Sequence, residues 1–235
     1  MIKLGTNSIG KIYLGTNSIG KAYLGSDLVF QRGVTPGPSP VFYDFLIFDG
    51  VAKIQTTVTL PESCSIRCQL GSETLKAAQR VFRATTNGLI QLIYNSNTTS
   101  TDRHLAVYYD STSVSGNATR AFSNTSMYFW MTPTKFGWGS TTANNLTKGS
   151  AHPTGGIELG GWDTGTPYTG KLGNVGIYGS DAQNATSYAE LSNYTPVALL
   201  RPCTYNGEAG LWWVEGNQFF GNTAGSGTLT VQNDS

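Results

Sequence analysis

Apolar and polar residues alternate along much of this chain with the two-residue period of a β-strand. Residues 53–60 show the pattern clearly, because Ile54 and Val58 fall on one face whereas Gln55 and Thr57 fall on the other. Alternation of this kind is typical of a strand that is buried on one face and solvated on the other. The pattern therefore predicts a sheet that lays one face against a core.

Similar short runs recur along the chain, and turn-forming Gly, Pro, Asn and Ser residues separate them. Two stretches stay ambiguous: residues 73–83 fit a short helix followed by a strand, and residues 181–191 fit either kind of element. With about fourteen short strands and hardly a helix, the chain is predicted to be all-β, and a two-sheet sandwich is the economical architecture. The predicted strands are 43–48, 53–60, 64–70, 80–84, 89–94, 104–109, 127–132, 135–138, 156–159, 170–178, 197–200, 210–213, 218–220 and 228–231.

The N-terminal residues repeat with a period of ten. Residues 2–11 read IKLGTNSIGK, residues 12–21 read IYLGTNSIGK, and residues 22–31 read AYLGSDLVFQ. Asn and Asp tolerate the positive φ angles that two-residue hairpin turns need. We therefore predict an antiparallel β-meander with turns at 6–7, 16–17 and 26–27 and with strands over 8–15, 18–25 and 28–32.

Both faces of this meander carry apolar residues, and a free meander of this size is marginally stable in water. We therefore predict that residues 1–33 anchor and oligomerise the chain, with symmetry mates covering the apolar faces. A flexible or crystallisation-derived tag stays open as the alternative. The predicted anchoring residues are Ile9, Ile12, Tyr13, Leu14, Ile19, Tyr23, Leu24, Leu28 and Phe30.

A proline-rich stretch separates the repeat from the rest of the chain. Residues 33–40 read GVTPGPSP, a composition typical of a semi-extended linker. The predicted organisation is an anchoring meander at 1–33, a linker at 34–41 and one β-sandwich at 42–235.

The composition excludes several classes of function. Charged residues make up 12% of the chain and the net charge is +1, without a basic stripe, so nucleic-acid binding is not expected. No stretch reaches the roughly 18 apolar residues of a membrane helix, and the N-terminus lacks the apolar region of a secretory leader. We therefore expect neither membrane insertion nor export through a leader.

The few cysteines and histidines indicate no bound cofactor. The three cysteines, Cys64, Cys68 and Cys203, are predicted to be reduced and partly buried. His104 and His152 have no neighbouring Cys or His at ligand spacing, so no metal site is predicted.

Four motifs that follow the linker carry a resemblance to a known family. They are FDG at 48–50, LGGWDTGTPYTGKLGNVGIYG at 159–179, LLRPCTYNGEAGLW at 199–212 and QFFGNTAGSGTLT at 218–230. Over roughly residues 42–232 the chain resembles the laminin-G-like, concanavalin-A-like jelly-roll modules of phage and gut-bacterial surface proteins. The element AYLGSDLVFQ resembles a repeat that precedes such modules in phage structural proteins. The chain departs from the pattern at Trp213, where an acidic residue is common, and it lacks an acidic pair that matches the calcium site of some laminin-G modules.

The resemblance implies a fold that also hosts glycoside hydrolases, which need two carboxylates beside the scissile bond. Related hydrolases carry these carboxylates as E-x-D-x-E on one strand, and this chain has no such spacing. Glu158 and Asp163 are the nearest pair, with two glycines between them. We therefore expect that the chain is not an enzyme.

Binding of glycans is the more plausible chemistry, because exposed aromatic rings stack on sugars while polar groups bond their hydroxyls. The loop GGWDTGTPYTG offers Trp162, Asp163 and Tyr168, and the loop near residues 137–145 offers Trp138 and Asn144. Packing of these aromatic rings against the sheets stays open as the alternative. Three further tryptophans bear on the core: Trp130 and Trp212 are predicted to belong to it, with Trp213 facing outward because successive strand residues alternate.

The sequence and the resemblance together favour a phage structural protein, a head or tail fibre or decoration. Residues 1–33 would attach it to other virion proteins and form a homo-oligomer, expected to be a trimer, and the lectin-like domain would touch glycans of the host surface. The expected location is the virion surface after assembly in the bacterial cytoplasm. The alternative is a secreted or cell-surface carbohydrate-binding module of a gut bacterium. Deleting residues 1–33 is predicted to leave a folded, monomeric and unattached domain.

Overall fold

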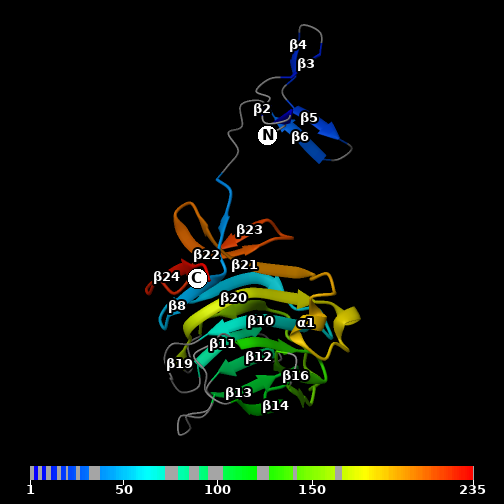
Figure 1. Cartoon of the computed structure of the whole chain (residues 1–235), viewed down its shortest axis with the longest axis vertical. Helices are drawn as coiled ribbons and strands as arrows, with labels where there is room; N and C mark the ends of the chain where they lie inside the picture. Colours follow the sequence, from blue (N-terminus) through cyan, green and yellow to red (C-terminus); the bar gives the residue numbers. More distant parts are fainter. Residues whose placement is uncertain are drawn as a thin grey trace. The chain divides into compact units, whose positions relative to one another are not determined.

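The computed structural model describes short strands within residues 3–31 and most of residues 38–234 (Figure 1). The chain divides into two compact units, Met1–Ser39 and Pro40–Ser235. This division falls inside the predicted linker. Outside the described residues lie the connections between the N-terminal strands and the segments 32–37, 72–78, 85–89, 95–102, 121–126, 140–141 and 162–165.

In the N-terminal unit, each copy of the repeat pairs with itself. The antiparallel pairs are β1 (Lys3–Leu4) with β2 (Asn7–Ser8), β3 (Ile12–Leu14) with β4 (Asn17–Ile19), and β5 (Lys21–Leu24) with β6 (Asp27–Gln31). Among the described residues these form three two-stranded sheets, in place of the one continuous meander that was predicted. The predicted strand at 18–25 contains a glycine, and glycine weakens a strand interior.

The predicted turns of this unit are also one residue too late. Leu4 pairs with Asn7, and Leu14 pairs with Asn17. In these two hairpins Asn is therefore the first residue of the second strand and not part of the turn. Of the predicted anchoring residues, Ile9 lies outside the described residues, and for the others the structure describes only the backbone strands. Their anchoring role stays a prediction.

The second unit is a sandwich of two sheets (Figure 1). In the described residues, the larger sheet is antiparallel and has 11 strands. Three of them lie off its main path: β7 (Val41–Phe42) pairs with β21, and β8 (Phe45–Asp49) pairs with β20 and with β24 (Leu229–Gln232). The main path runs β17 (Thr142–Asn145), β16 (Lys135–Trp138), β15 (Met127–Met131), β10 (Ser65–Gly71), β20 (Thr169–Tyr178), β21 (Ala198–Tyr205), β22 (Glu208–Trp213), β23 (Gln218–Phe220).

The smaller sheet has seven strands in the described residues. Its path runs β14 (Gly116–Arg120), β13 (Arg103–Tyr108), β12 (Ile90–Tyr94), β11 (Gln79–Ala84), β18 (Gly156–Leu159), β9 (Ile54–Thr59), and β19 (Thr166–Pro167) pairs with β11 in parallel. In β9 every second residue is buried, as the alternation predicts. The all-β sandwich predicted from the sequence is therefore confirmed.

The core lies between the two sheets. Phe48, Phe82 and Phe129 are each at most 1% exposed and belong to one buried cluster. Burial of one such side chain contributes about 1.5–3 kcal/mol to the free energy of unfolding. On each strand, the residues that alternate with these core residues face away from the core. Short alternating runs are therefore enough to build this fold.

One stretch of ambiguous sequence covers part of the outer face of the larger sheet. It forms a 3₁₀ turn (Ser180–Ala182) and the short helix α1 (Tyr188–Leu191). The hydroxyl of Ser187 accepts a hydrogen bond from the Glu190 N–H at 3.1 Å, a typical N-terminal cap. Of the other ambiguous stretch, residues 79–83 belong to β11, and the part predicted as a helix lies mostly outside the described residues.

Four described strands of the sandwich were not predicted from the sequence. The two-residue strands β7 and β19 are two of them, and the others are β14, GNATR, and β17, TANN, which end the paths of the two sheets. An edge strand has one neighbour and needs few apolar residues, so its sequence lacks the alternation that marks an inner strand.

The tryptophans test the predicted faces. Trp130 is fully buried, as predicted, but it lies in a smaller cluster beneath α1 and not between the two sheets. Trp213 packs against the main core on the same side as the buried Leu211, whereas Trp212 lies on the opposite face. The prediction for Trp212 and Trp213 is therefore wrong, because the strand places residues 211 and 213 inward.

The three cysteines are unpaired, as predicted, but they are fully buried where partial burial was expected. Burial raises the pKa of the Cys64 thiol to about 12 and that of the Cys203 thiol to about 11, so both stay protonated at neutral pH. In the described part of the chain, no helix is long and apolar enough to cross a membrane.

Candidate functional site

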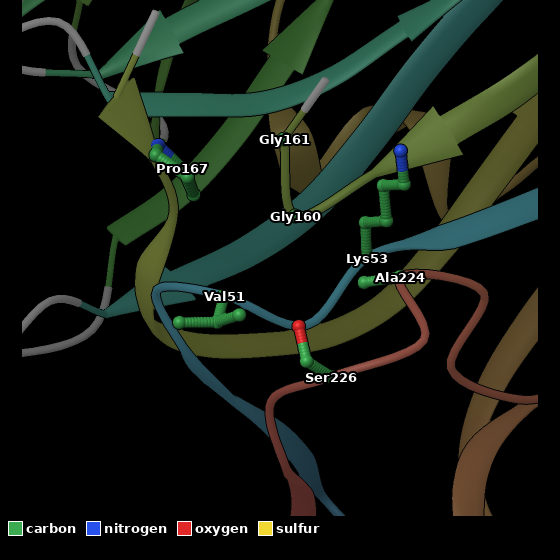
Figure 2. A pocket seen from close by; sticks show the side chains of 7 residues that line it. All are labelled: Val51, Lys53, Gly160, Gly161, Pro167, Ala224 and Ser226. Carbon is green, nitrogen blue, oxygen red and sulfur yellow. The ribbon is translucent and has the colours of Figure 1, made fainter. Parts of the chain in front are cut away.

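Three loops meet at one end of the sandwich and enclose a pocket of about 220 Å³. They are the β8–β9 connection, the start of the β18–β19 connection and the β23–β24 connection (Figure 2). Each carries one of the motifs FDG, LGG and GNTAGSG. Figure 2 shows the lining residues around one hollow: Val51, Lys53, Gly160, Gly161, Pro167, Ala224 and Ser226.

Asp49 fixes the first loop and ties it to the third. One carboxylate oxygen accepts hydrogen bonds from the N–H groups of Val51 and Ala52, both at 2.8 Å. The other oxygen accepts from the Thr228 N–H at 2.5 Å. Partial desolvation raises the pKa of Asp49, but the backbone hydrogen bonds together outweigh it and hold that pKa below its usual 3.8. The charged carboxylate therefore organises this corner of the pocket.

Asn222 belongs to the third loop and holds its shape through side-chain hydrogen bonds. Its side-chain oxygen accepts from the N–H groups of Lys53 and Ala224, at 3.2 and 3.0 Å. Its side-chain amide donates to the carbonyls of Ser226 and Gly227, at 2.9 and 3.1 Å. One carboxamide thus satisfies four backbone groups, so Lys53 and Ser226 are held on a backbone of defined shape.

The second loop depends on two glycines. Gly160 has φ +85°, and a Cβ there would come within 2.3 Å of the Phe48 ring. Gly161 has φ +135°, and a Cβ there would lie 3.0 Å from Pro167. No other residue combines this conformation with this close approach. The two glycines therefore bring the loop against the FDG segment and open the pocket beside it.

The pocket can take a small polar ligand. Its volume lies below the roughly 300–1,000 Å³ of sites for drug-sized ligands, so it suits one ring-sized group. Lys53 contributes an ammonium group with three donors, and Ser226 contributes a hydroxyl that donates and accepts. Among the described residues, no group of three or more His, Cys, Asp or Glu side chains could hold a metal ion.

The predicted glycan-binding loop begins and ends at this pocket. Gly161 and Pro167, which line it, lie on either side of residues 162–165 in the sequence. Trp162 and Asp163 themselves lie outside the described residues, so their role stays a prediction.

Tyr168 does not belong to a binding surface. Its side chain is fully buried and its ring packs against Phe48 with a centroid distance of 6.0 Å. The hydroxyl donates to the carbonyls of Gly71 and Lys171, at 2.6 and 2.7 Å. The prediction that Tyr168 contacts a glycan is corrected: the residue supports the start of β20.

Trp138 and Asn144 lie in another part of the sandwich. Trp138 is half-buried against the main core, and Asn144 pairs with the buried Phe136. The strand of Trp138 is three positions from β20 in the larger sheet, which is about 14 Å at ~4.8 Å per strand. The structure therefore does not bring Trp138 and Asn144 together with the pocket.

Two lining residues, Lys53 and Ser226, were not identified from the sequence. Both sit beside glycine-containing motifs, FDG and AGSG, that the resemblance singled out. A signal was therefore present in the motifs, but nothing in the sequence shows that residues 53 and 226 face the same hollow.

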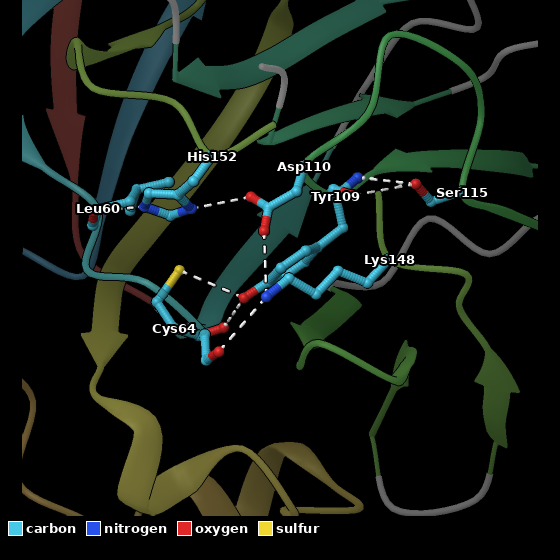
Figure 3. A network of polar contacts seen from close by, with 8 residues as sticks. Leu60, Cys64, Tyr109, Asp110, Ser115, Lys148 and His152 are labelled. Atoms are coloured by element: carbon cyan, nitrogen blue, oxygen red, sulfur yellow. Dashed lines mark hydrogen bonds and ion pairs between the residues drawn. The ribbon is translucent and has the colours of Figure 1, made fainter. Parts of the chain in front are cut away.

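A second polar cluster surrounds Asp110, which is 2% exposed (Figure 3). Its carboxylate lies 2.9 Å from Nδ1 of His152 and 3.4 Å from Nζ of Lys148. The other ring nitrogen of His152 lies 2.9 Å from the Leu60 carbonyl oxygen, so both nitrogens are occupied. Tyr109 donates its hydroxyl hydrogen to the Cys64 carbonyl at 2.6 Å. This cluster joins three loops and leaves no nitrogen of His152 to act on a substrate.

No protein-family model matches the chain, and no curated protein matches it. Its fold is similar to the native heptameric SAP-like pentraxin from Limulus polyphemus, with TM-score 0.52 and 12% identity over 81% of this chain and 95% of that one. It is also similar to a candidate carbohydrate-binding protein from Bacteroides ovatus, with TM-score 0.50 and 12% identity over 83% of this chain. The match spans 62% of that protein, less than two thirds of its length. At this identity the likeness shows the jelly-roll fold alone.

Proposed function

We propose that the chain is a glycan-binding adhesion module that recognises one sugar unit in the pocket lined by Lys53 and Ser226. The observation that carries the proposal is the convergence of three glycine-containing loops on one small pocket, where Asp49 and Asn222 tie the first loop to the third and Lys53 and Ser226 supply polar groups. A preformed site of this kind loses little conformational entropy on binding. The jelly-roll fold, shared with a candidate carbohydrate-binding protein, supports the same function.

In this proposal each group has a role that follows from its chemistry. The Lys53 ammonium donates to sugar hydroxyls or to an acidic substituent, and the Ser226 hydroxyl bonds a neighbouring hydroxyl. Trp162 would stack on the sugar face and Asp163 would accept from its hydroxyls, as predicted from the sequence. Both residues belong to the loop that begins and ends at the pocket.

We propose binding without hydrolysis. Glu158, one of the two carboxylates weighed for catalysis, forms an ion pair with Arg83 at 2.5 Å. A glycosidase needs two carboxyl groups that flank the scissile bond, and the carboxylate of Glu158 is already engaged by the Arg83 side chain.

The second part of the proposal concerns how this module is attached through the N-terminal repeat. The division of the chain into two units supports an N-terminal repeat that attaches and a sandwich that binds. We keep the hypothesis of a homo-oligomer, expected to be a trimer, on a phage virion assembled in the bacterial cytoplasm. A secreted or cell-surface module of a gut bacterium is the alternative. Imaging of intact virions with a label on the sandwich would separate the two.

A glycan array tests the binding function. The full chain is expected to bind a subset of glycans, and Lys53→Met and Trp162→Ala are each expected to weaken binding at least tenfold. Tyr128→Ala is the matched control, because Tyr128 is an exposed aromatic residue on β15, away from the pocket. Equal binding by all four proteins would reject the pocket as the site, and absence of binding by the unaltered chain would reject the function.

A further inference from the structure

The outer face of the larger sheet is divided into two halves. On the half formed by β15, β10 and β20, Trp130 and Tyr178 are fully buried beneath the segment that contains α1. This segment supplies Leu191 and Tyr188 to the same small cluster. The chain therefore covers the large aromatic side chains of this half with its own residues.

The other half, on β21, β22 and β23, also carries large aromatic side chains. Tyr205 lies 5.2 Å from Trp212 and 5.5 Å from Phe219, measured between ring centroids. Beside them, the Arg201 guanidinium lies over the Phe42 ring at 3.9 Å. We call this surface the aromatic patch; its members are Phe42, Leu199, Arg201, Tyr205, Trp212 and Phe219.

The patch is preformed. Phe219 lies over Gly210, where a Cβ would come within 2.7 Å of the ring. Cys203, which lies between Arg201 and Tyr205 on the outward face of β21, is fully buried. The patch side chains thus already hold one another in place, which lowers the entropy lost when a partner binds.

The patch is only partly covered in the described part of the chain. Trp212, Tyr205 and Phe219 are each half-buried, in contrast with the fully buried Trp130. Val197 and Val214 flank the ends of β21 and β22, and they are 50% and 41% exposed. The patch therefore keeps accessible apolar surface, flanked by two exposed valines, that is available to a partner.

The chemistry of the patch fits a protein better than a sugar. Trp, Tyr and Arg are the residues most enriched at the energetically dominant positions of protein interfaces. Sugar recognition needs a ring face that is open to the sugar, whereas the ring of Tyr205 already packs against those of Trp212 and Phe219. The patch therefore favours a protein partner.

The charges at the patch make it complementary to a second copy of itself. Arg201 lies at one end, opposite Trp212, and the exposed Glu208 lies at the other, opposite Tyr205. Arg201 and Tyr205 are four residues apart on β21, which is about 13 Å at ~3.3 Å per residue. In a two-fold contact, residue i of one copy meets residue j of the other, and the reverse contact forms at the same time. An antiparallel approach of two patches places Arg201 against Glu208 of the partner subunit, twice.

We propose that two copies of the chain associate through the aromatic patch about a two-fold axis. Trp212 and Phe219 form the apolar centre, and the two Arg201–Glu208 pairs set the orientation. This contact is separate from the anchoring role of the N-terminal repeat and from the pocket. This contact doubles the number of chains in the assembly that the repeat forms, and it therefore doubles the number of glycan-binding sites in that assembly.

The test compares the masses of full-length variants by sedimentation equilibrium over a range of concentrations. Arg201→Glu and Glu208→Arg are each expected to halve the mass of the assembly, because both ion pairs become repulsive. The double variant Arg201→Glu/Glu208→Arg is expected to restore the mass, because the pairs reform with exchanged signs. Trp212→Ala is expected to halve the mass, and Tyr128→Ala, an exposed aromatic change outside the patch, is the matched control.

Each outcome decides the proposal. Equal masses for the unaltered chain and all variants would overturn it. A halved mass in both single variants without recovery in the double variant would overturn the two-fold pairing of Arg201 with Glu208. Glycan binding is measured on the same samples, so loss of the pocket function would be seen separately from loss of the contact.

Discussion

At the residue scale, one carboxylate explains much of the pocket's shape. Asp49 accepts three backbone hydrogen bonds, two within its own loop and one from Thr228, 179 residues along the chain. The sequence predicted FDG as a family motif, but it could not show this use of the carboxylate. The contact depends on the tertiary arrangement of two loops, and local sequence patterns carry no information about it.

Asp49→Asn tests this role. The substitution replaces one accepting oxygen with an NH₂ group that faces a backbone N–H, and since Asp49 is exposed, we expect a loss of about 1 kcal/mol in the free energy of unfolding. Because the folded-state pKa lies below 3.8, the stabilisation is present above pH 3.8 and is lost as the pH falls through the folded-state value. Urea titrations from pH 7 to pH 2 should show the two proteins converging at low pH. A constant difference across that range would contradict the charge-based explanation.

Asp110 provides a stronger case, because its carboxylate is buried beside two basic groups. Asp110→Asn keeps the shape and tolerates the local φ of +50°, but it removes the charge that faces His152 and Lys148. Because the side chains of Lys148 and His152 are 31% and 23% exposed, water stabilises both after the change, and we expect a loss of about 1–2 kcal/mol in the free energy of unfolding. The measurement is chemical denaturation at pH 7. Asp181→Asn, at an exposed site, is the control and should change stability by less than about 0.5 kcal/mol.

At the scale of elements, strands were predictable where one face is buried. The core of β9 follows from strict alternation, and β16, β18 and β23 have the predicted bounds. The edge strand β17 was missed, because an edge needs few apolar residues. The register of the N-terminal hairpins was missed for another reason: a ten-residue repeat permits two pairings of its strands, and the alternation fits both.

Gly160→Ala tests the loop that opens the pocket. The new Cβ would sit at φ +85° and meet the Phe48 ring at 2.3 Å, so we expect a loss of more than about 2 kcal/mol in stability, together with weaker glycan binding. Gly207→Ala is the matched control, since Gly207 has φ +84° with no atom within 4 Å of a Cβ. It should cost about 1 kcal/mol and leave binding unchanged. Thermal unfolding and glycan titration of both variants provide the comparison, and equal losses would reject the steric explanation.

At the scale of the whole molecule, the fold class followed from the sequence and the boundary between the two units falls inside the predicted linker, whereas the site followed only in part. The loop of Trp162 was predicted as a glycan-binding loop, and the motifs FDG and AGSG were singled out by the resemblance. Their convergence was not, because it depends on which strands of the two sheets become neighbours. The outward position of Trp212 was missed for the same reason, since both neighbouring tryptophans are apolar and only the register against Leu211 distinguishes them.

Deleting residues 1–33 tests the separation of roles between the two units. The unit Pro40–Ser235 holds both sheets of the sandwich and the whole core, so the truncated chain should unfold at the same temperature as the full chain and bind the same glycans.

The sequence predicted a monomer for this truncation, but the aromatic patch changes that expectation. We now expect the truncated chain to have the mass of two copies, and adding Arg201→Glu should reduce it to one copy. Light scattering at several concentrations measures both masses. If the truncated chain forms an assembly with as many copies as the full-length chain, the repeat does not oligomerise the protein. If the truncated chain is unfolded, the sandwich depends on the repeat.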